Sequence, residues 1–201
     1  MKQENYILNG YQNSEGNYDF FNVTNSNSDV VKYNDIMSNI SENQSNMLDT
    51  IEMVSQWFLN VSTMSNKKLQ KLCYYAYCWY IVFFNDIESV IDKKSSINTL
   101  CPECFQAWIH GPVLPKLYYK YKKYGWQNIP KISYSPKLSE KITSLLEQVW
   151  EAYGELSADE LEELSHQELP WKKARRGMKN WMACSNEISP YDILIYYSSL
   201  E

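Results

Sequence analysis

Cys101 and Cys104 are separated by two residues, the spacing of half a zinc site or of a redox dithiol. A structural zinc ion needs four ligands, and the remaining cysteines and histidines form no second pair two to four residues apart. A redox dithiol is expected where a helix begins after a strand, and the surrounding sequence lacks that pattern. The chain has five cysteines, an odd number, and is large enough to fold without disulfides. We therefore interpret this pair as incidental or buried thiols.

His166 and Glu168 combine a base with a carboxylate that can orient it, which is the minimum for proton transfer. No serine or cysteine nucleophile motif and no second metal ligand accompanies them in the sequence. Pro170 and Trp171 follow closely, so a helix end fixed by side-chain hydrogen bonds beside a buried tryptophan explains the same residues. We expect no catalytic role for this segment.

A basic block places five lysines and arginines within residues 172–179. It follows an acidic stretch, residues 147–168, which has eight acidic residues and no lysine or arginine. Such alternating blocks usually form complementary solvated faces of one domain. The alternative is a nucleic-acid site in which Trp171 or Trp181 stacks on bases. The whole chain carries 19 basic and 24 acidic residues, and this net charge of −5 disfavours nucleic acid as a partner.

The elements that position these residues are predicted to be mainly α-helices. Only 6 of the 201 residues are glycine, the residue on which tight hairpins most depend. Residues 66–84 predict a helix that is apolar almost all round, with a continuous stripe on one side and Tyr74 and Tyr77 on the other. Such a helix must be central, or one side of it must meet a partner. Tyr74 and Tyr77 are therefore candidate partner contacts.

Further helices are indicated by an apolar face at Ile51, Val54 and Phe58, and by residues typical of helix ends. Serine or proline marks a start and glycine marks a stop. These signals are Pro115 with Gly125, Ser135-Pro136 with Gly154, the Ser157–Glu160 capping box, and Ser189-Pro190. Residues 104–108 predict one short strand. The predicted fold class is a compact, mainly α, multi-helix domain with at most a small β element.

Residues 1–46 differ in composition from residues 47–201, and we predict a weakly ordered acidic arm before one helical domain. The arm has 11 asparagines, 6 serines and a net charge of −4, and it sustains no helical or alternating period. Its aromatic residues, Phe20 and Phe21 above all, can anchor an extended segment on a partner. The longest uncharged apolar run has 12 residues and the N-terminus lacks the features of a secretory signal, so we expect a cytoplasmic protein without a membrane span.

Three sequence blocks, in this order, resemble the SocA-like Panacea family of antitoxins from bacterial and phage toxin–antitoxin loci. The first block is residues 68–76, Lys-Leu-Gln-Lys-Leu-Cys-Tyr-Tyr-Ala, in which Cys73 replaces a leucine of the family pattern. The second is residues 107–115, Ala-Trp-Ile-His-Gly-Pro-Val-Leu-Pro, and the third is residues 166–171, His-Gln-Glu-Leu-Pro-Trp. His110 departs from the family pattern, so the resemblance assigns no role to it.

The resemblance implies a mostly helical domain that binds proteins and neutralises a toxin encoded next to it. It implies no cofactor and no catalysis, and the alternative partner is a protease or a host defence protein. The matching residues are expected to be mostly structural, and partner choice is expected on other surfaces. They are Leu69, Gln70, Lys71, Leu72, Tyr75, Trp108, Gly111, Pro112, Val113, His166, Glu168, Pro170 and Trp171.

Overall fold

The computed structural model describes residues 50–93, 96–134, 136–179 and 181–200. The acidic arm predicted at residues 1–46, with its candidate partner contacts Phe20 and Phe21, lies outside the described residues. Within them the chain forms eight α-helices and two sheets of two strands each, so the prediction of a mainly α fold with a small β element is confirmed. None of the described helices is long and apolar enough to cross a membrane.

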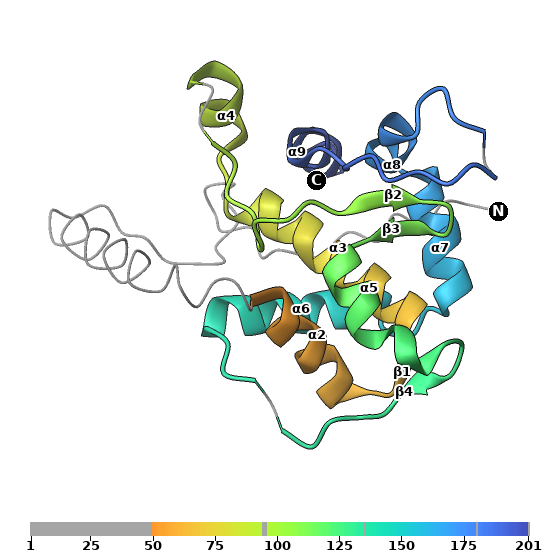
Figure 1. The fold of residues 1–201 in the computed structure, drawn as a ribbon. Coiled ribbons are helices and arrows are strands. Elements are labelled where there is room, and N and C mark those ends of the chain that lie inside the picture. Colours follow the sequence, from red (N-terminus) through yellow and green to blue (C-terminus); the bar gives the residue numbers. More distant parts are fainter. Residues whose placement is uncertain (1–49, 94–95, 135, 180, 201) are drawn as a thin grey trace, which may run out of the picture.

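Helix α3, Asn66–Phe83, runs through the centre of the molecule (Figure 1). It begins at Ser65, whose side chain accepts a hydrogen bond from the backbone N–H of Lys68. Other helices pack around it, which explains why its sequence is apolar on all sides. These helices are α2 (Thr50–Val61), α6 (Glu140–Tyr153), α7 (Ala158–Gln167) and α9 (Pro190–Ser198).

The prediction that Tyr74 and Tyr77 contact a partner is wrong, because both side chains are fully buried in the core. Each ring packs against Phe105, with ring centroids 5.5 Å and 5.3 Å apart. The second apolar side of α3 is therefore covered by this chain itself. A surface contact would require either tyrosine to leave the core, at a cost of several kcal/mol.

The remaining helices are short and lie around the central bundle. Helix α4, Ile87–Lys93, stands at the edge of the molecule, and α8, Leu169–Ala174, follows α7 closely (Figure 1). Helix α5, Pro115–Tyr121, continues as the 3₁₀ helix η3, Lys122–Tyr124, which ends at Gly125. The predicted helix between Pro115 and Gly125 is thus present, with its last turn tightened.

Two small antiparallel sheets complete the fold. Strand β1, Met64–Ser65, pairs with β4, Asn128–Ile129. Strand β2, Gln106–Trp108, pairs with β3, Gly111–Val113, in a hairpin whose last pair is Trp108 opposite Gly111. The predicted strand near residues 104–108 corresponds to β2.

Most predicted helix ends agree with the structure, and one does not. Ser157 accepts a hydrogen bond from Glu160 N–H while the Glu160 carboxylate accepts one from Ser157 N–H, which is the predicted capping box. Helix α6, however, begins at Glu140 and not at Ser135-Pro136. Ser139 caps the helix, because its side chain accepts a hydrogen bond from the backbone N–H of Ile142. A serine can cap any helix start whose third residue offers its N–H in this way.

Candidate functional site

The first sequence block holds the second in place through two buried polar side chains of α3. Lys71 Nζ donates a hydrogen bond to the carbonyl oxygen of Pro112 at 3.1 Å. Gln70 Oε1 accepts one from the backbone N–H of Leu114 at 2.8 Å. Strand β3 is therefore fixed against the N-terminal half of α3.

The third block joins the other two. Trp171 Nε1 donates to the carbonyl oxygen of Trp108 at 3.2 Å, which ties α8 to β2. Tyr75 donates its hydroxyl to Glu168 Oε1 at 3.0 Å, which ties the start of α8 to α3. All three blocks thus meet at the β2–β3 hairpin, and their other members Leu69, Leu72, Val113 and Pro170 are buried.

Lys71 is the most unusual residue at this junction, because its side chain is 1% exposed and its ammonium group hydrogen bonds to a neutral carbonyl. Burial lowers the pKa of Lys71 to about 7, although the nearby Glu162 carboxylate acts in the opposite direction. A lysine retained at such a position opposes stability when it is charged.

Gly111 lies directly over this lysine. Its φ of +91° is unfavourable for residues with a side chain, and an added Cβ would lie 2.6 Å from Lys71 Cε and 2.8 Å from Ser165 Oγ. The close approach of the hairpin to α3 thus requires glycine.

We expect Gly111→Ala to lower the free energy of unfolding by about 3 kcal/mol, because backbone strain and overpacking add. Gly177→Ala is the matched control: its φ is also positive, at +85°, but an added Cβ meets no atom within 4 Å. Strain alone should cost the control about 1 kcal/mol. Urea denaturation of the two variants measures the difference, and equal losses would show that Gly111 is not closely packed.

Glu168, like Lys71, is a charged residue type that is buried at the junction of the three blocks. Its two carboxylate oxygens accept hydrogen bonds from Tyr75, at 3.0 Å, and from Tyr197 of α9, at 2.9 Å. Burial raises the pKa of Glu168 to about 7, and the hydrogen bonds from Tyr197 and Tyr75 act against this increase. The carboxyl group therefore connects α3, α8 and α9 within the core.

His166 packs against an aromatic ring and has no hydrogen bond to Glu168 in the part of the chain that the structure describes. Its ring stacks on Trp171, with ring centroids 4.0 Å apart, and partial burial lowers the pKa of the imidazole. Among the described residues no hydrogen bond joins His166 to Glu168, whose partners are the two tyrosine hydroxyls. The arrangement matches the interpretation of a helix end beside a buried tryptophan.

Arg175 belongs to the predicted basic block but is 4% exposed. Its guanidinium donates to the carbonyl oxygens of Ala107 and Met182, each at 2.8 Å, and to that of Lys179 at 3.3 Å. It thereby fastens the segment after α8 to β2. Lys173 also pairs with Asp192 of α9 at 2.8 Å, whereas Lys172, Arg176 and Lys179 of the block are exposed.

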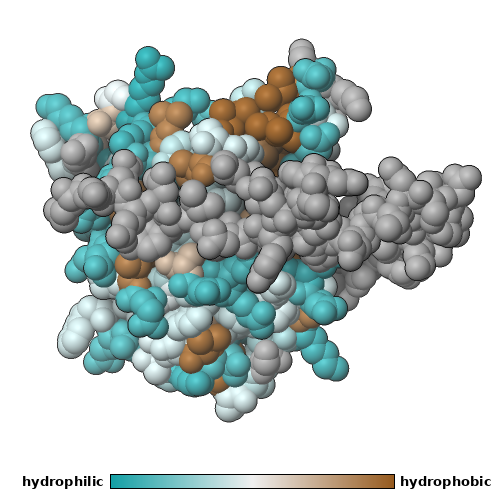
Figure 2. All heavy atoms as spheres, turned by 180° about the vertical axis from the view of Figure 1, so that it is seen from behind, coloured by the Kyte–Doolittle hydropathy of each residue, from teal (hydrophilic) through white to brown (hydrophobic). Residues whose placement is uncertain are grey.

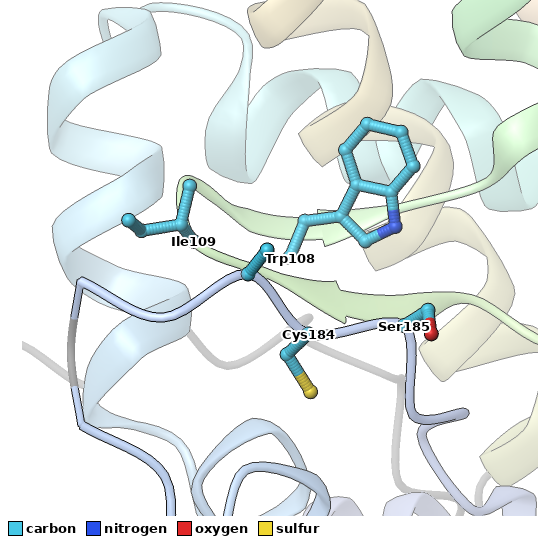
Figure 3. Close-up of a pocket in the computed structure, with 5 residues that line it drawn as sticks. Trp108, Ile109, Cys184 and Ser185 are labelled. Carbon is cyan, nitrogen blue, oxygen red and sulfur yellow. The ribbon is translucent and has the colours of Figure 1, made fainter.

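The turn of the hairpin is surrounded by hollows. One, of about 320 Å³, lies between Trp108 and Ile109 on one side and residues 183–185 on the other. Figure 3 shows the indole of Trp108 pointing away from the thiol of Cys184. We call Trp108, Ile109 and His110, with residues 181–185, the hairpin face.

Large hydrophobic side chains are exposed on this face. Trp181 is 71% exposed and Met182 is 44% exposed, on the segment that Arg175 fastens to β2. His110 is also exposed and lies 3.0 Å from Glu162, which in turn pairs with Lys67. Partial burial alone would raise the pKa of Glu162, but the hydrogen bonds from Lys67 and His110 lower it.

A second apolar surface lies at α4. Figure 2 shows hydrophobic side chains gathered at the upper right, on the side of the molecule where α4 stands. Ile91 of α4 is 48% exposed. This surface is separate in the fold from the three sequence blocks and provides a comparison for the hairpin face.

Both cysteines of the Cys101–Cys104 pair are free thiols in this structure. Cys101 is buried and its Sγ donates to the carbonyl oxygen of Glu103 at 3.3 Å, while Cys104 is half-buried. Burial raises the pKa of Cys101 to about 12. Across the described ranges, no three histidine, cysteine or acidic side chains cluster as metal ligands would.

Comparison with known protein families identifies the family to which these three sequence blocks belong. Residues 69–172 match the family described as "Antitoxin SocA-like, Panacea domain", a stretch that covers more than half of the chain. The chain belongs to this family. The match includes α3, the hairpin and the start of α8, which are the parts of the Panacea domain that the three blocks join. No curated protein and no solved structure matches the chain.

Family membership supports a role of the toxin–antitoxin type for this Panacea domain. The sequence blocks locate the junction and include Ile109, whereas Arg175 and the exposed Trp181 lie outside them. Arg175 lies just beyond the matched residues and is surrounded by other charges in the sequence, so no local pattern distinguishes it from its solvated neighbours.

Proposed function

We propose that this protein is an antitoxin that neutralises a cognate toxin by binding it directly, without catalysis. The observation that carries the proposal is the match to the antitoxin family over α3, the hairpin and α8. Three polar side chains that sequence reasoning could assign to chemistry or to ligand binding, those of Glu168, His166 and Arg175, contact other parts of this chain. The exposed surface is thus left to act on a partner.

The hairpin face is the proposed contact surface. It combines exposed tryptophan and methionine, which are enriched in protein interfaces, with a half-buried isoleucine at the hairpin turn. The hollow beside Ile109 can accept an inserted side chain of a partner. Because the hairpin is fixed to α3 and α8, binding orders few groups and loses little conformational entropy.

We expect Ile109→Glu to weaken binding of the toxin by about 100-fold or more, because a charge would be buried at the centre of the interface. Ile91→Glu is the matched control, since it places the same change on the exposed apolar surface of α4. The measurement is biolayer interferometry with the purified product of the adjacent gene. Weakening by Ile91→Glu alone would place the interface at α4 and contradict the proposed surface.

A different partner class is the main alternative outcome. If a pull-down with this protein returns a protease or a defence protein, and the product of the adjacent gene does not bind, the protein acts as an adaptor or regulator. That result would overturn the antitoxin proposal and leave the fold unaffected.

A further inference from the structure

A second hollow, of about 410 Å³, lies on the other side of the hairpin turn. Its walls come from the first turns of α3, from the hairpin and from α5 with η3. The volume is within the range of pockets that hold small ligands, roughly 300–1,000 Å³. It is built largely from residues of the first two sequence blocks.

The lining of this pocket is positively charged. Lys67, Lys71, Lys122 and His110 all contribute to it, and none of the described residues that line it is acidic. Lys67 and His110 share Glu162, which belongs to the neighbouring helix α7. Lys71 and Lys122 have no carboxylate partner among the described residues, so two cations remain to attract an anion.

Lys71 makes the pocket more than a basic surface. Its ammonium group has three N–H donors, and within the described part of the chain it forms one hydrogen bond, to Pro112. A buried cation of this kind is stabilised when an anion supplies charge and further acceptors. The lysine is therefore suited to an oxyanion that enters the pocket.

The apolar part of the pocket suits a flat ring. Trp108 and Tyr118 both line it and meet edge to face, with ring centroids 4.9 Å apart. Aromatic walls of this kind stack on nucleobases with little preference among them. An oxyanion and an aromatic ring are the two parts of a nucleotide.

We propose that this pocket binds a mononucleotide, with its phosphate toward Lys71 and Lys122 and its base against Trp108 and Tyr118. The pocket shares Trp108, Ile109 and His110 with the hairpin face. Nucleotide binding is nevertheless a further activity beyond the proposed function, and its absence in a titration would leave toxin binding untouched.

Isothermal titration of the full chain tests the proposal with three probes: adenosine monophosphate, inorganic phosphate and adenosine. We expect adenosine monophosphate to bind with one site per chain, and each of the other two to bind at least about tenfold more weakly. If none of the three gives saturable heat, the proposal is overturned. If phosphate alone binds as tightly as the nucleotide, the assignment of a base site is overturned.

Neighbouring lysines provide the matched variants. Lys122 lines the pocket, whereas Lys123 is also exposed but is not among the residues that line it. We expect Lys122→Glu to weaken nucleotide binding at least about tenfold and Lys123→Glu to change it less than about twofold. Equal weakening by both would indicate general electrostatic attraction and contradict a built site.

Lys71→Met tests the buried cation. We expect it to abolish measurable binding in a chain that still folds, because methionine fills similar space and the removal of a buried charge offsets part of the lost hydrogen bond to Pro112. Unchanged binding in a folded Lys71→Met variant would overturn the role of Lys71. If the Lys71→Met variant does not fold, the comparison of Lys122→Glu with Lys123→Glu still tests whether the pocket binds the nucleotide.

Discussion

Arg175→Ala is expected to lower the free energy of unfolding by about 4 kcal/mol, among the largest losses for one residue of this protein. The guanidinium is buried and donates to carbonyl oxygens of Ala107, Lys179 and Met182, so its removal leaves buried acceptors unpaired. The segment after α8 would then lose its attachment to β2. Urea denaturation measures the stability, and proteolysis at residues 179–185 measures the release of that segment.

The adjacent arginine is the control for this change. Arg176 is exposed, so Arg176→Ala is expected to alter stability by less than about 0.5 kcal/mol. Arg175→Lys should recover only part of the loss, because an ammonium group cannot reproduce the planar set of donors. Similar losses for the alanine variants at 175 and 176 would contradict the buried anchoring role.

Glu168→Gln is expected to change how stability depends on pH. The pKa of Glu168 in the folded protein is raised from about 4.5 to about 7, so the unfolded chain releases this proton at lower pH than the folded chain does. Stability from this group is complete below pH 4.5 and is lost as pH rises to 7. Since each pKa unit corresponds to about 1.4 kcal/mol, the loss is about 3 kcal/mol.

The measurement is the difference in unfolding free energy between Glu168→Gln and wild type from pH 4 to 8. It should shift by about 3 kcal/mol in favour of the variant across this range, and then level off. Glu163→Gln, on the exposed side of α7, controls for the loss of one negative charge. A difference that stays constant with pH would show that the pKa of Glu168 is the same in the folded and the unfolded chain, and would contradict the raised pKa.

Local signals predicted the helices well because capping and apolar periodicity act within a few residues. The Ser157–Glu160 box and the apolar stripe of α3 are examples. The start of α6 was misplaced because Ser135-Pro136 and Ser139 are both acceptable starts, and packing decides between them.

The junction at the hairpin was less predictable because it depends on contacts between distant residues. Sequence periodicity leaves open whether the second side of α3 faces the core or a partner. In the structure, the rings of Tyr74 and Tyr77 pack against Phe105, so this side faces the core. Lys71 and Arg175 are charged residues that the fold buries, whereas residue type alone places such side chains at the surface. The resemblance to the family identified the blocks that meet, but it did not identify the pocket that they enclose.

Co-expression with the adjacent gene tests the central proposal, that this Panacea domain neutralises a toxin, most directly. We expect that the adjacent gene stops growth when it is expressed alone, and that co-expression of the wild-type chain restores growth. The Ile109→Glu variant, expressed at the same level, should fail to restore it, whereas Ile91→Glu should succeed. A harmless neighbour, or a toxic one that remains lethal beside the wild-type chain, would contradict the account.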